Sequence, residues 1–486
     1  MIVFNSIEYI LFLLLVVIAY WFLPRIWQNI LLLVASYFFY ATWDWRYLGI
    51  IIFLTLMNFY IGNIIWVSSD DRTKKRYAVF LIGVNVLTLG FFKYYNFFLD
   101  SLDVLLSSFH LSVAGLHLDI ILPIGISFIT FQKIAYIYDL YTKKTQPADS
   151  LLSFALFSCF FPQLIAGPIE RPSHLLPQIQ NPRVWDVNNL LVGCDFIIWG
   201  MLKKIFIADN VAYYVNLIFS LKQPSTLLIF VAVFAFGIQI YADFSGYSDI
   251  ARGSAKLLGI DLIRNFNHPY LSQTPQEFWR RWHISLSSWL RDYVYIPLGG
   301  SRCSKARHIF NLFVTWFVCG LWHGAAWHFV VWGLYNGLMV TLSSMRHKIN
   351  KVKEETPRIA FGVIVSIVIT YLIMNFGWLF FRVGNMSDIV RFFSLRALLR
   401  SPSDLSIAIV IIVIMIFYSL PLLLADIWHS PGTNAFFRKY LKKPCWICEK
   451  FQSILPYKRG ICYSILILVI VIFGANGKAD FIYFQF

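Results

Sequence analysis

The sequence contains 486 residues, of which 58% are hydrophobic and only 14% are charged. A soluble protein would carry about a quarter charged residues, so the composition excludes an ordinary soluble domain. The formal net charge of +16 would suggest nucleic-acid binding in a soluble protein. Here the basic residues gather in short loops between apolar runs, as in the cytoplasmic loops of membrane proteins, and we expect no nucleic-acid partner.

The apolar runs predict an all-α polytopic membrane protein. Many runs reach about 18 residues, which is enough to cross a hydrocarbon core of roughly 30 Å, and we expect about 10–12 transmembrane helices. A barrel would need alternating apolar and polar residues, and runs such as LFLLLVVIAYWFL do not alternate. The predicted spans, in chain order, are 8–24, 28–42, 46–67, 77–98, 121–140, 187–219, 225–243, 308–343, 358–381, 404–427 and 460–475. The predicted amphipathic segments are 100–116, 150–165, 273–295 and 386–400.

Two features of these runs refine the topology. The first run lacks a preceding basic region, so we interpret it as a span and not as a cleavable signal peptide. Basic stretches indicate the cytoplasmic loops under the positive-inside rule, and they occupy residues 70–76, 301–307, 346–358 and 438–459.

The run at 308–343 must enter the membrane and return, because the basic loops on both sides of it are predicted to be cytoplasmic. We expect two short passes or a re-entrant hairpin, with a break near GLWHGAAW, from Gly320 to Trp327. Gly320 and Gly324 would permit the bend. His323 would then lie inside the membrane, at the turn.

His323 is a candidate functional residue. An ionisable side chain within the membrane is a functional hypothesis by default, and histidine accepts and returns a proton near neutral pH. The alternative is a histidine that is hydrogen-bonded between helices for structure.

A dense polar cluster occupies FWRRWHISLSSWLRDYVYIPLGG, residues 278–300. If this stretch is one helix, an aromatic and apolar stripe forms on one face from Trp282, Leu286, Trp289 and Tyr293. A polar line forms on another face from His283, Ser287 and Arg291. Such a helix would lie in the interface as an anchor, or re-entrant with its polar line facing a cavity. The pair His283 and His323 favours a shared polar chamber.

A further polar motif is YADFSGYSDIA, at 241–251. Asp243, Ser245 and Asp249 interrupt an apolar region, where a carboxylate is costly unless it is paired or hydrated. An ion pair with the arginines of 280–291 and a direct catalytic role both stay open.

The segment FFPQLIAGPIERP, at 160–172, is broken by proline and glycine and ends in Glu170 and Arg171. We interpret it mainly as architecture at the mouth of the chamber.

The seven cysteines show no disulfide spacing. Cys445 and Cys448 form a CxxC in a basic loop, and a redox or metal role would need more context than this. We interpret them as ordinary thiols, and the sequence contains no convincing metal-ligand set.

Six stretches of the chain share their residues and order with a known family. They are LPIGISFITFQKIAYIYDLY (122–141), FPQLIAGPIERPSHLLPQI (161–179), YADFSGYSDIA (241–251), EFWRRWHISLSSWLRDYVYIPLGG (277–300), GLWHGAAWHFVVWG (320–333) and FGWLFFRV (376–383). Together they resemble the membrane-bound O-acyltransferase family, and more closely its bacterial branch that acylates cell-envelope polysaccharides.

The resemblance implies one membrane-embedded domain over 1–486, with a catalytic core at 120–343 around a central funnel. The family's invariant histidine corresponds to His323, and its second active-site position corresponds to His283. No role is carried onto His328.

The resemblance also implies the chemistry. An acyl group would move from a cytoplasmic thioester, most simply acetyl-CoA, to a hydroxyl outside the membrane. His323 would act as general base, and His283 would orient the acceptor or polarise the thioester carbonyl. We expect no tightly bound cofactor and no metal, with acetyl-CoA as a donor substrate only.

The expected location is the bacterial cytoplasmic (inner) membrane, within the lipid bilayer. No gap between the spans accommodates a soluble domain, so an extracytoplasmic SGNH-type or similar polysaccharide acetyltransferase is expected as a partner. Peptidoglycan and an alginate-like exopolysaccharide both stay open as the envelope acceptor. D-alanyl transfer to teichoic acid is an alternative among enzymes, and a transporter or channel is an alternative from another class.

The C-terminal stretch FIYFQF, at 481–486, is predicted to be an extracytoplasmic tail, because the last predicted span leads away from the cytoplasmic loop at 438–459. It resembles the aromatic, tyrosine-containing C-terminal motif of a small partner peptide in teichoic-acid D-alanylation. Tyr483 is therefore a third candidate catalytic residue, which would receive the acyl group as an ester and pass it outward. The alternative is an interfacial anchor, since aromatic residues gather at membrane interfaces.

Overall fold

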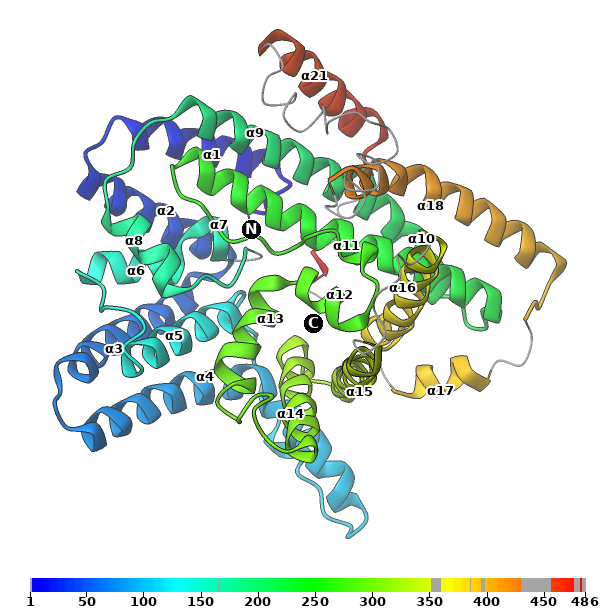
Figure 1. The fold of residues 1–486 in the computed structure, drawn as a ribbon, viewed down its shortest axis with the longest axis horizontal. Coiled ribbons are helices and arrows are strands. Elements are labelled where there is room, and N and C mark those ends of the chain that lie inside the picture. Colours follow the sequence, from blue (N-terminus) through cyan, green and yellow to red (C-terminus); the bar gives the residue numbers. More distant parts are fainter. Residues whose placement is uncertain are drawn as a thin grey trace. The chain divides into compact units, whose positions relative to one another are not determined.

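The computed structural model describes residues 2–164, 167–350, 360–384, 386–394, 398–429, 456–475 and 481–482 (Figure 1). Every regular element within these ranges is a helix, which confirms the predicted all-α fold. The first helices are α1 (Ile7–Trp21), α2 (Arg25–Asp44), α3 (Leu48–Val67), α4 (Asp71–Ser107), α5 (Ile126–Tyr141), α6 (Leu151–Cys159), α7 (Phe161–Leu164) and α8 (Pro172–Gln180). Two short 3₁₀ turns accompany them, η1 (Trp45–Tyr47) and η2 (Ala114–Leu116).

The later elements include two π-helical segments, η3 and η5. The helices are α9 (Val187–Met201), α10 (Asp209–Phe219), α11 (Thr226–Leu257), α12 (Pro275–Arg281), α13 (Ile284–Leu290), α14 (Lys305–His323), α15 (Trp327–Asn350), α16 (Ala360–Arg382), α17 (Met386–Ser394), α18 (Pro402–His429) and α21 (Pro456–Phe473). The shorter elements are η3 (Leu202–Ala208), η4 (Pro269–Leu271) and η5 (Arg291–Tyr295).

The chain divides into two compact units. The first comprises Met1–Ile197 with Asp249–Ile263, and the second comprises Ile198–Ser248 with Arg264–Phe486. The expected single domain over 1–486, with a catalytic core at 120–343, stays a prediction.

Helix starts follow the local sequence. Several N-terminal turns are capped by a side-chain oxygen that accepts a hydrogen bond from an otherwise unsatisfied backbone N–H. The capping residues include Ser6 of α1, Asp70 of α4, Ser150 of α6, Thr274 of α12 and Ser304 of α14.

Buried polar side chains join helices in the first unit. The amide of Asn85 in α4 donates to the Asn58 side chain in α3 at 2.9 Å, and Asn58 donates in return at 3.4 Å. Nζ of Lys133 in α5 donates to Oγ1 of Thr55 in α3 at 3.1 Å. Such hydrogen bonds hold helices together in lipid, where apolar burial between helices provides little driving force.

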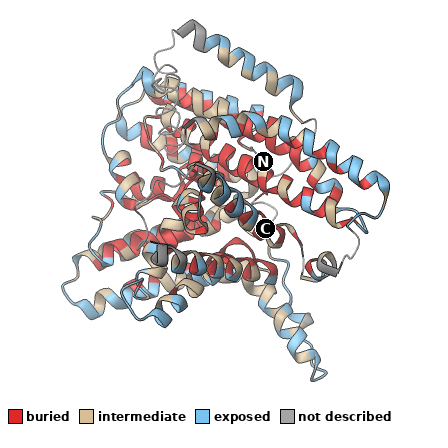
Figure 2. Cartoon of the chain, turned by 45° about the vertical axis from the view of Figure 1, so that its right-hand side comes forward, coloured by how far each residue is buried: buried red, intermediate tan, exposed pale blue. Residues whose placement is uncertain are grey.

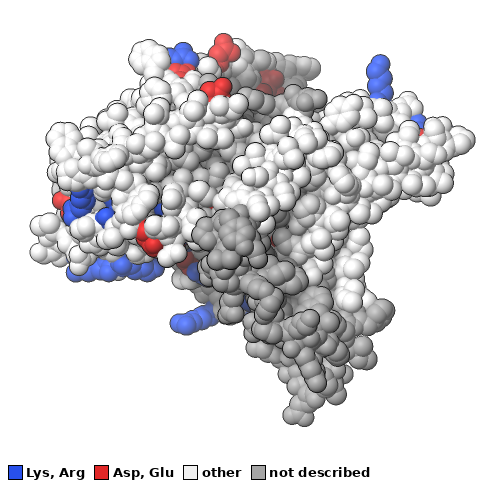
Figure 3. All heavy atoms as spheres, turned by 90° about the horizontal axis from the view of Figure 1, so that it is seen from above, with Lys and Arg blue, Asp and Glu red and all other residues white. Residues whose placement is uncertain are grey.

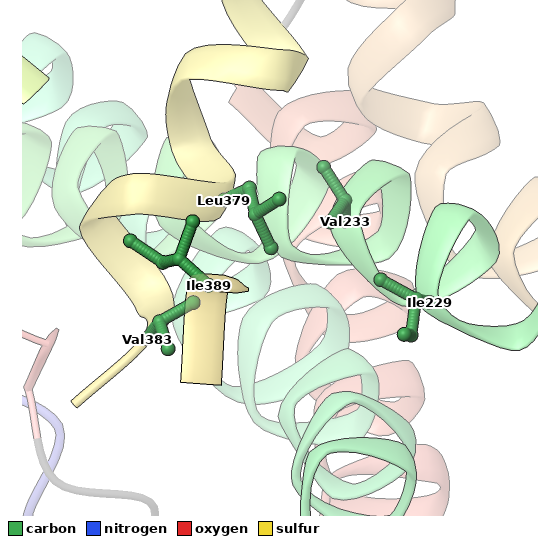
Figure 4. Close-up of a cluster of buried hydrophobic side chains, with 5 residues drawn as sticks. All are labelled: Ile229, Val233, Leu379, Val383 and Ile389. Carbon is green, nitrogen blue, oxygen red and sulfur yellow. The ribbon is translucent and has the colours of Figure 1, made fainter. Parts of the chain in front are cut away.

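The second unit has an apolar cluster between α11, α16 and α17 (Figure 4). It consists of Ile229, Val233, Leu379, Val383 and Ile389. Helix α11 is the most enclosed of the long apolar helices, since 78% of its most apolar window is buried, compared with 22% for α18. Figure 2 shows helices that carry buried residues on one face and exposed residues on another.

Five helical stretches are long and apolar enough to cross a membrane within the described part of the chain. They are Arg25–Val67, Asp71–Ser107, Thr226–Leu257, Gly362–Arg382 and Pro402–Ile427, with shorter apolar helices at Ile7–Trp21 and Gly460–Phe473. Large apolar side chains on α18, such as Val413 and Phe417, are exposed, and charged side chains are sparse on the face drawn in Figure 3. An apolar surface of this extent marks contact with lipid.

Two predicted boundaries differ from the structure. The segments at 77–98 and 100–116 were expected to be separate, but α4 continues unbroken to Ser107. The polar motif at 241–251 lies entirely within α11. Polar side chains do not end a helix when neighbouring helices provide partners for them.

Candidate active site

His323 is the last residue of α14, and α15 begins four residues later at Trp327. The predicted break between Gly320 and Trp327 is therefore confirmed. Helices α14 and α15 pack against each other as a hairpin (Figure 1). The His323 side chain is buried, because this packing encloses the turn.

The glycines act differently from our prediction that they bend the backbone. Gly324 has an extended φ of −163°, which any residue adopts. Gly320 is helical, and a Cβ atom there would collide with the carbonyl oxygen of Phe329. A Cβ on Gly333 would likewise collide with the carbonyl of Trp316. The glycines Gly320 and Gly333 therefore allow close approach of α14 and α15.

Aromatic rings surround His323. Its imidazole lies 4.9 Å from the Trp322 ring, 4.8 Å from the Trp332 ring and 5.2 Å from the Phe381 ring, measured between centroids. These three rings pack around the imidazole and restrict its orientation. The shared polar chamber that we expected around His283 and His323 stays a prediction.

The single helix that we considered for the cluster at 278–300 is not present. Helix α12 ends at Arg281 and α13 begins at Ile284. His283 separates them, in the left-handed conformation with φ 43° and ψ 54°. Periodicity over Trp282–Tyr293 could not reveal this break, because the spacing of apolar residues carries no information on the φ angle of one residue, and positive φ is uncommon outside glycine.

The left-handed turn makes His283 the N-cap of α13. Its Nδ1 accepts a hydrogen bond from the backbone N–H of Leu286 at 3.3 Å. A neutral imidazole with Nδ1 as acceptor carries its proton on Nε2. In this state His283 presents an N–H donor at Nε2, which suits it to polarise an oxygen and not to remove a proton.

The indole of Trp322 contacts both candidate histidines. Its ring centroid lies 5.7 Å from that of His283 and 4.9 Å from that of His323. The two histidines are 40 positions apart in the sequence, and in the structure both contact the Trp322 ring. Their catalytic roles stay predictions.

Asp243 has a different partner from the one we expected. Its Oδ1 lies 2.8 Å from Nζ of Lys204, and not against the arginines of 280–291. Lys204 also pairs with Asp209 at 2.7 Å, and all three side chains are buried. Lys204 lies in the π-helical segment η3. The sequence indicated the need of Asp243 for a partner, and the adjacent Lys203 and Lys204 inside the predicted span 187–219 were the sign of where that partner lies.

Glu170 is fully buried in the first unit. One carboxylate oxygen accepts the backbone N–H of Ile263 at 2.6 Å, and the other contacts Nδ1 of His174 at 2.8 Å. The hydrogen bond to Glu170 raises the pKa of His174 above its ordinary value. These contacts tie α8 to the loop that follows α11, in keeping with an architectural role.

Tyr483, together with Cys445 and Cys448, lies outside the described residues. The two residues before Tyr483 are described and buried. The Ile482 backbone N–H donates to Oδ2 of Asp243 at 2.8 Å. The Phe481 ring lies 4.2 Å from that of Tyr247 and 5.9 Å from that of Phe244.

Sequence reasoning missed a second charged cluster in the second unit. Nδ1 of His268 lies 2.8 Å from Oδ1 of Asp426, and the Tyr241 hydroxyl donates to both oxygens of this carboxylate at 2.9 and 3.1 Å. The sequence indication of this cluster was Asp426, an acidic residue near the end of the predicted span 404–427. No group of three or more histidine, cysteine, aspartate or glutamate residues within the described ranges could hold a metal ion, and the expected lack of a metal stays a prediction.

Comparison with known proteins adds an independent observation. A family model described as MBOAT, the membrane-bound O-acyltransferase family, matches residues 13–381, which include both histidines. A probable alginate O-acetylase of Pseudomonas aeruginosa is 41% identical over 361 residues, which cover 74% of this chain and 68% of the relative.

Two other relatives act on different polymers, according to their names. The peptidoglycan O-acetyltransferase of Helicobacter pylori is 35% identical over 399 residues, covering 76% of this chain and 72% of the relative. The teichoic acid D-alanyltransferase of Bacillus subtilis is 30% identical over 277 residues, covering 53% of this chain and 68% of the relative.

Proposed function

Since the chain belongs to the membrane-bound O-acyltransferase family, we propose that it passes an acetyl group from cytoplasmic acetyl-CoA across the membrane for O-acetylation of a cell-envelope polysaccharide. The chain is an acyltransferase and a multi-pass membrane protein. The observation that supports the proposed site is the placement of His283 and His323 around Trp322.

In the proposed reaction, His323 takes the proton of an accepting hydroxyl as its oxygen attacks the thioester carbonyl carbon. The carbon–sulfur bond breaks, an ester forms, and the coenzyme A thiolate leaves and regains a proton. His283 donates its Nε2–H to the carbonyl oxygen, where negative charge develops. The two histidines thus have separate tasks, as the hydrogen bond from Leu286 to Nδ1 of His283 supports.

The acceptor is proposed to be peptidoglycan or an alginate-like exopolysaccharide. The names of the relatives from Pseudomonas aeruginosa and Helicobacter pylori support acetyl transfer. The D-alanyltransferase of Bacillus subtilis matches 53% of this chain, compared with 74% and 76% for the two acetylating relatives. D-alanyl transfer is therefore the second choice. Family membership favours an enzyme over a transporter. We place the protein in the bacterial inner membrane as part of the same proposal.

We further propose that the acetyl group passes through Tyr483 as an ester before it reaches an extracytoplasmic SGNH-type transferase. Tyr483 is joined directly to Ile482, whose backbone binds Asp243. Phe481 packs on Phe244, and the Phe244 ring lies 4.7 Å from that of His283. The described part of the tail therefore lies one aromatic ring away from His283, which supports the relay.

Purified protein incubated with acetyl-CoA labelled in the acetyl group tests the function. We expect labelled ester and free coenzyme A thiol in equal amounts, with neither product from the His323→Ala variant. A transporter would instead move its substrate without consuming any thioester. Thioester that stays intact in the presence of acceptor would contradict the proposal.

A further inference from the structure

The backbone at His283 is held in an unfavourable conformation by its surroundings. A residue other than glycine at positive φ is strained, and such a conformation persists only where other contacts enforce it. His283 lies at φ 43° between α12 and α13. Some part of the chain must therefore stabilise this turn.

Asn265 provides the contacts at the start of α13. Its backbone carbonyl accepts the N–H of Ile284 at 2.9 Å, and its side-chain Oδ1 accepts the N–H of Ser285 at 3.4 Å. These two donors belong to the first turn of α13, where backbone N–H groups lack partners within the helix. The His283 imidazole itself accepts the third, from Leu286.

Neighbouring hydrogen bonds hold Asn265 in place. Its Nδ2 donates to Oγ of Ser248 in α11 at 3.2 Å, which orients the side-chain oxygen towards Ser285. Two residues further on, the Asn267 N–H donates to the Arg281 carbonyl at 2.9 Å. The segment from Asn265 to Asn267 therefore binds the chain on both sides of the Trp282–His283 pair.

We infer that Asn265 is a positioning residue for His283: its two oxygens hold the left-handed turn and so fix the direction of the imidazole. The inference rests on the proposed role of His283, and Asn265 itself contacts no reacting atom in this proposal. Since Asn265 is 1% exposed and Ser248 is 2% exposed, water cannot readily replace either contact.

A double-mutant cycle tests, without any substrate, whether Asn265 holds the left-handed turn at His283. Glycine adopts positive φ without strain, so His283→Gly removes the conformation that Asn265 has to enforce. We expect Asn265→Ala to lower the apparent unfolding temperature by about 2–4 °C in the wild-type background, and by clearly less when His283→Gly is present. Asn375→Ala removes a buried amide from α16, and its effect should add to that of His283→Gly.

Kinetic measurements test whether the contacts of Asn265 at this turn contribute to catalysis. In Asn265→Ala we expect kcat for acetyl transfer to fall about tenfold or more with little change in the KM for acetyl-CoA, because a misdirected catalytic group weakens the transition state more than donor binding. Asn265→Asp keeps an acceptor for the Ser285 N–H, so it should retain more activity than Asn265→Ala.

Additive unfolding shifts for positions 265 and 283, or an unchanged kcat in Asn265→Ala, would overturn the inference. If wild-type protein transfers no acetyl group, the proposed function fails. Coupled unfolding shifts would then still support Asn265 as the residue that holds the turn.

Discussion

Ile482 donates its backbone N–H to the carboxylate of Asp243, across 239 positions of the sequence. The other oxygen of this carboxylate pairs with Lys204, which also pairs with Asp209. A buried ion cluster in the second unit thus provides the acceptor for the C-terminal segment.

Lys204→Met should destabilise the protein strongly, by about 3–5 kcal/mol, because it leaves two buried carboxylates without their cation. Asp243→Asn should cost less, about 1–3 kcal/mol, because Lys204 keeps Asp209, although the single amide oxygen can accept from only one of Lys204 and Ile482. Thermal unfolding in detergent, followed by tryptophan fluorescence, compares the two. Equal losses in both variants would show that the cluster does not act as an ion network.

His323→Ala should abolish acetyl transfer while expression and assembly stay intact, because the change removes the proposed proton acceptor from the end of α14. General-base catalysis typically contributes about a hundredfold or more. Release of coenzyme A thiol from purified protein measures the effect. A variant that retains more than about a tenth of wild-type activity would show that His323 is not the base.

His283→Asn should retain part of the activity and His283→Ala much less. An asparagine amide donates a hydrogen bond where a methyl group cannot, and asparagine tolerates both the left-handed conformation and the N-cap position of α13. The same thiol-release assay, with a melting curve for each variant, separates lost chemistry from lost folding. Equal activity in the two variants would mean that the side chain only fills space.

Tyr483→Phe should block acetylation of the polymer while binding of the thioester survives. The phenol has an ordinary pKa near 10, so it needs an adjacent base to act as a nucleophile, and phenylalanine has no hydroxyl to acylate. Intact-mass analysis of the C-terminal peptide should show an acetyl adduct in cells that lack the downstream transferase. Normal polymer acetylation in the Tyr483→Phe strain would rule out the relay and leave the tail as an anchor.

The pair of His174 and Glu170 should make stability depend on pH. The pKa of His174 is raised in the folded state by Glu170, so the stabilisation is fully present below the unfolded pKa of about 6.5. It is lost as pH rises through the higher folded pKa. His174→Gln keeps a donor for Glu170 but does not titrate. The apparent unfolding temperature of wild type should therefore fall relative to that of His174→Gln as pH rises above about 6.5; parallel curves would contradict this.

The sequence by itself determined the membrane class, the helical fold and the hairpin at His323. Runs of apolar residues longer than the bilayer core allow few other structures. The basic loops on both sides of 308–343 are predicted to be cytoplasmic, so this stretch has to return to the side from which it entered. The length of an apolar run and the charge of a loop depend only on the residues within them, so both can be judged without knowing which helices are neighbours.

The tertiary structure alone decided the conformation of His283, the partner of Asp243 and the shared contact at Trp322. Periodicity suggested one helix through the cluster at 278–300 and missed the turn at His283. The left-handed turn depends on Asn265, which lies in another segment of the chain. Likewise, Asp243 pairs with Lys204 and not with the arginines of 280–291. Pairing in a buried site depends on which helices meet in space, because a charge there is stable only beside a partner within about 4 Å.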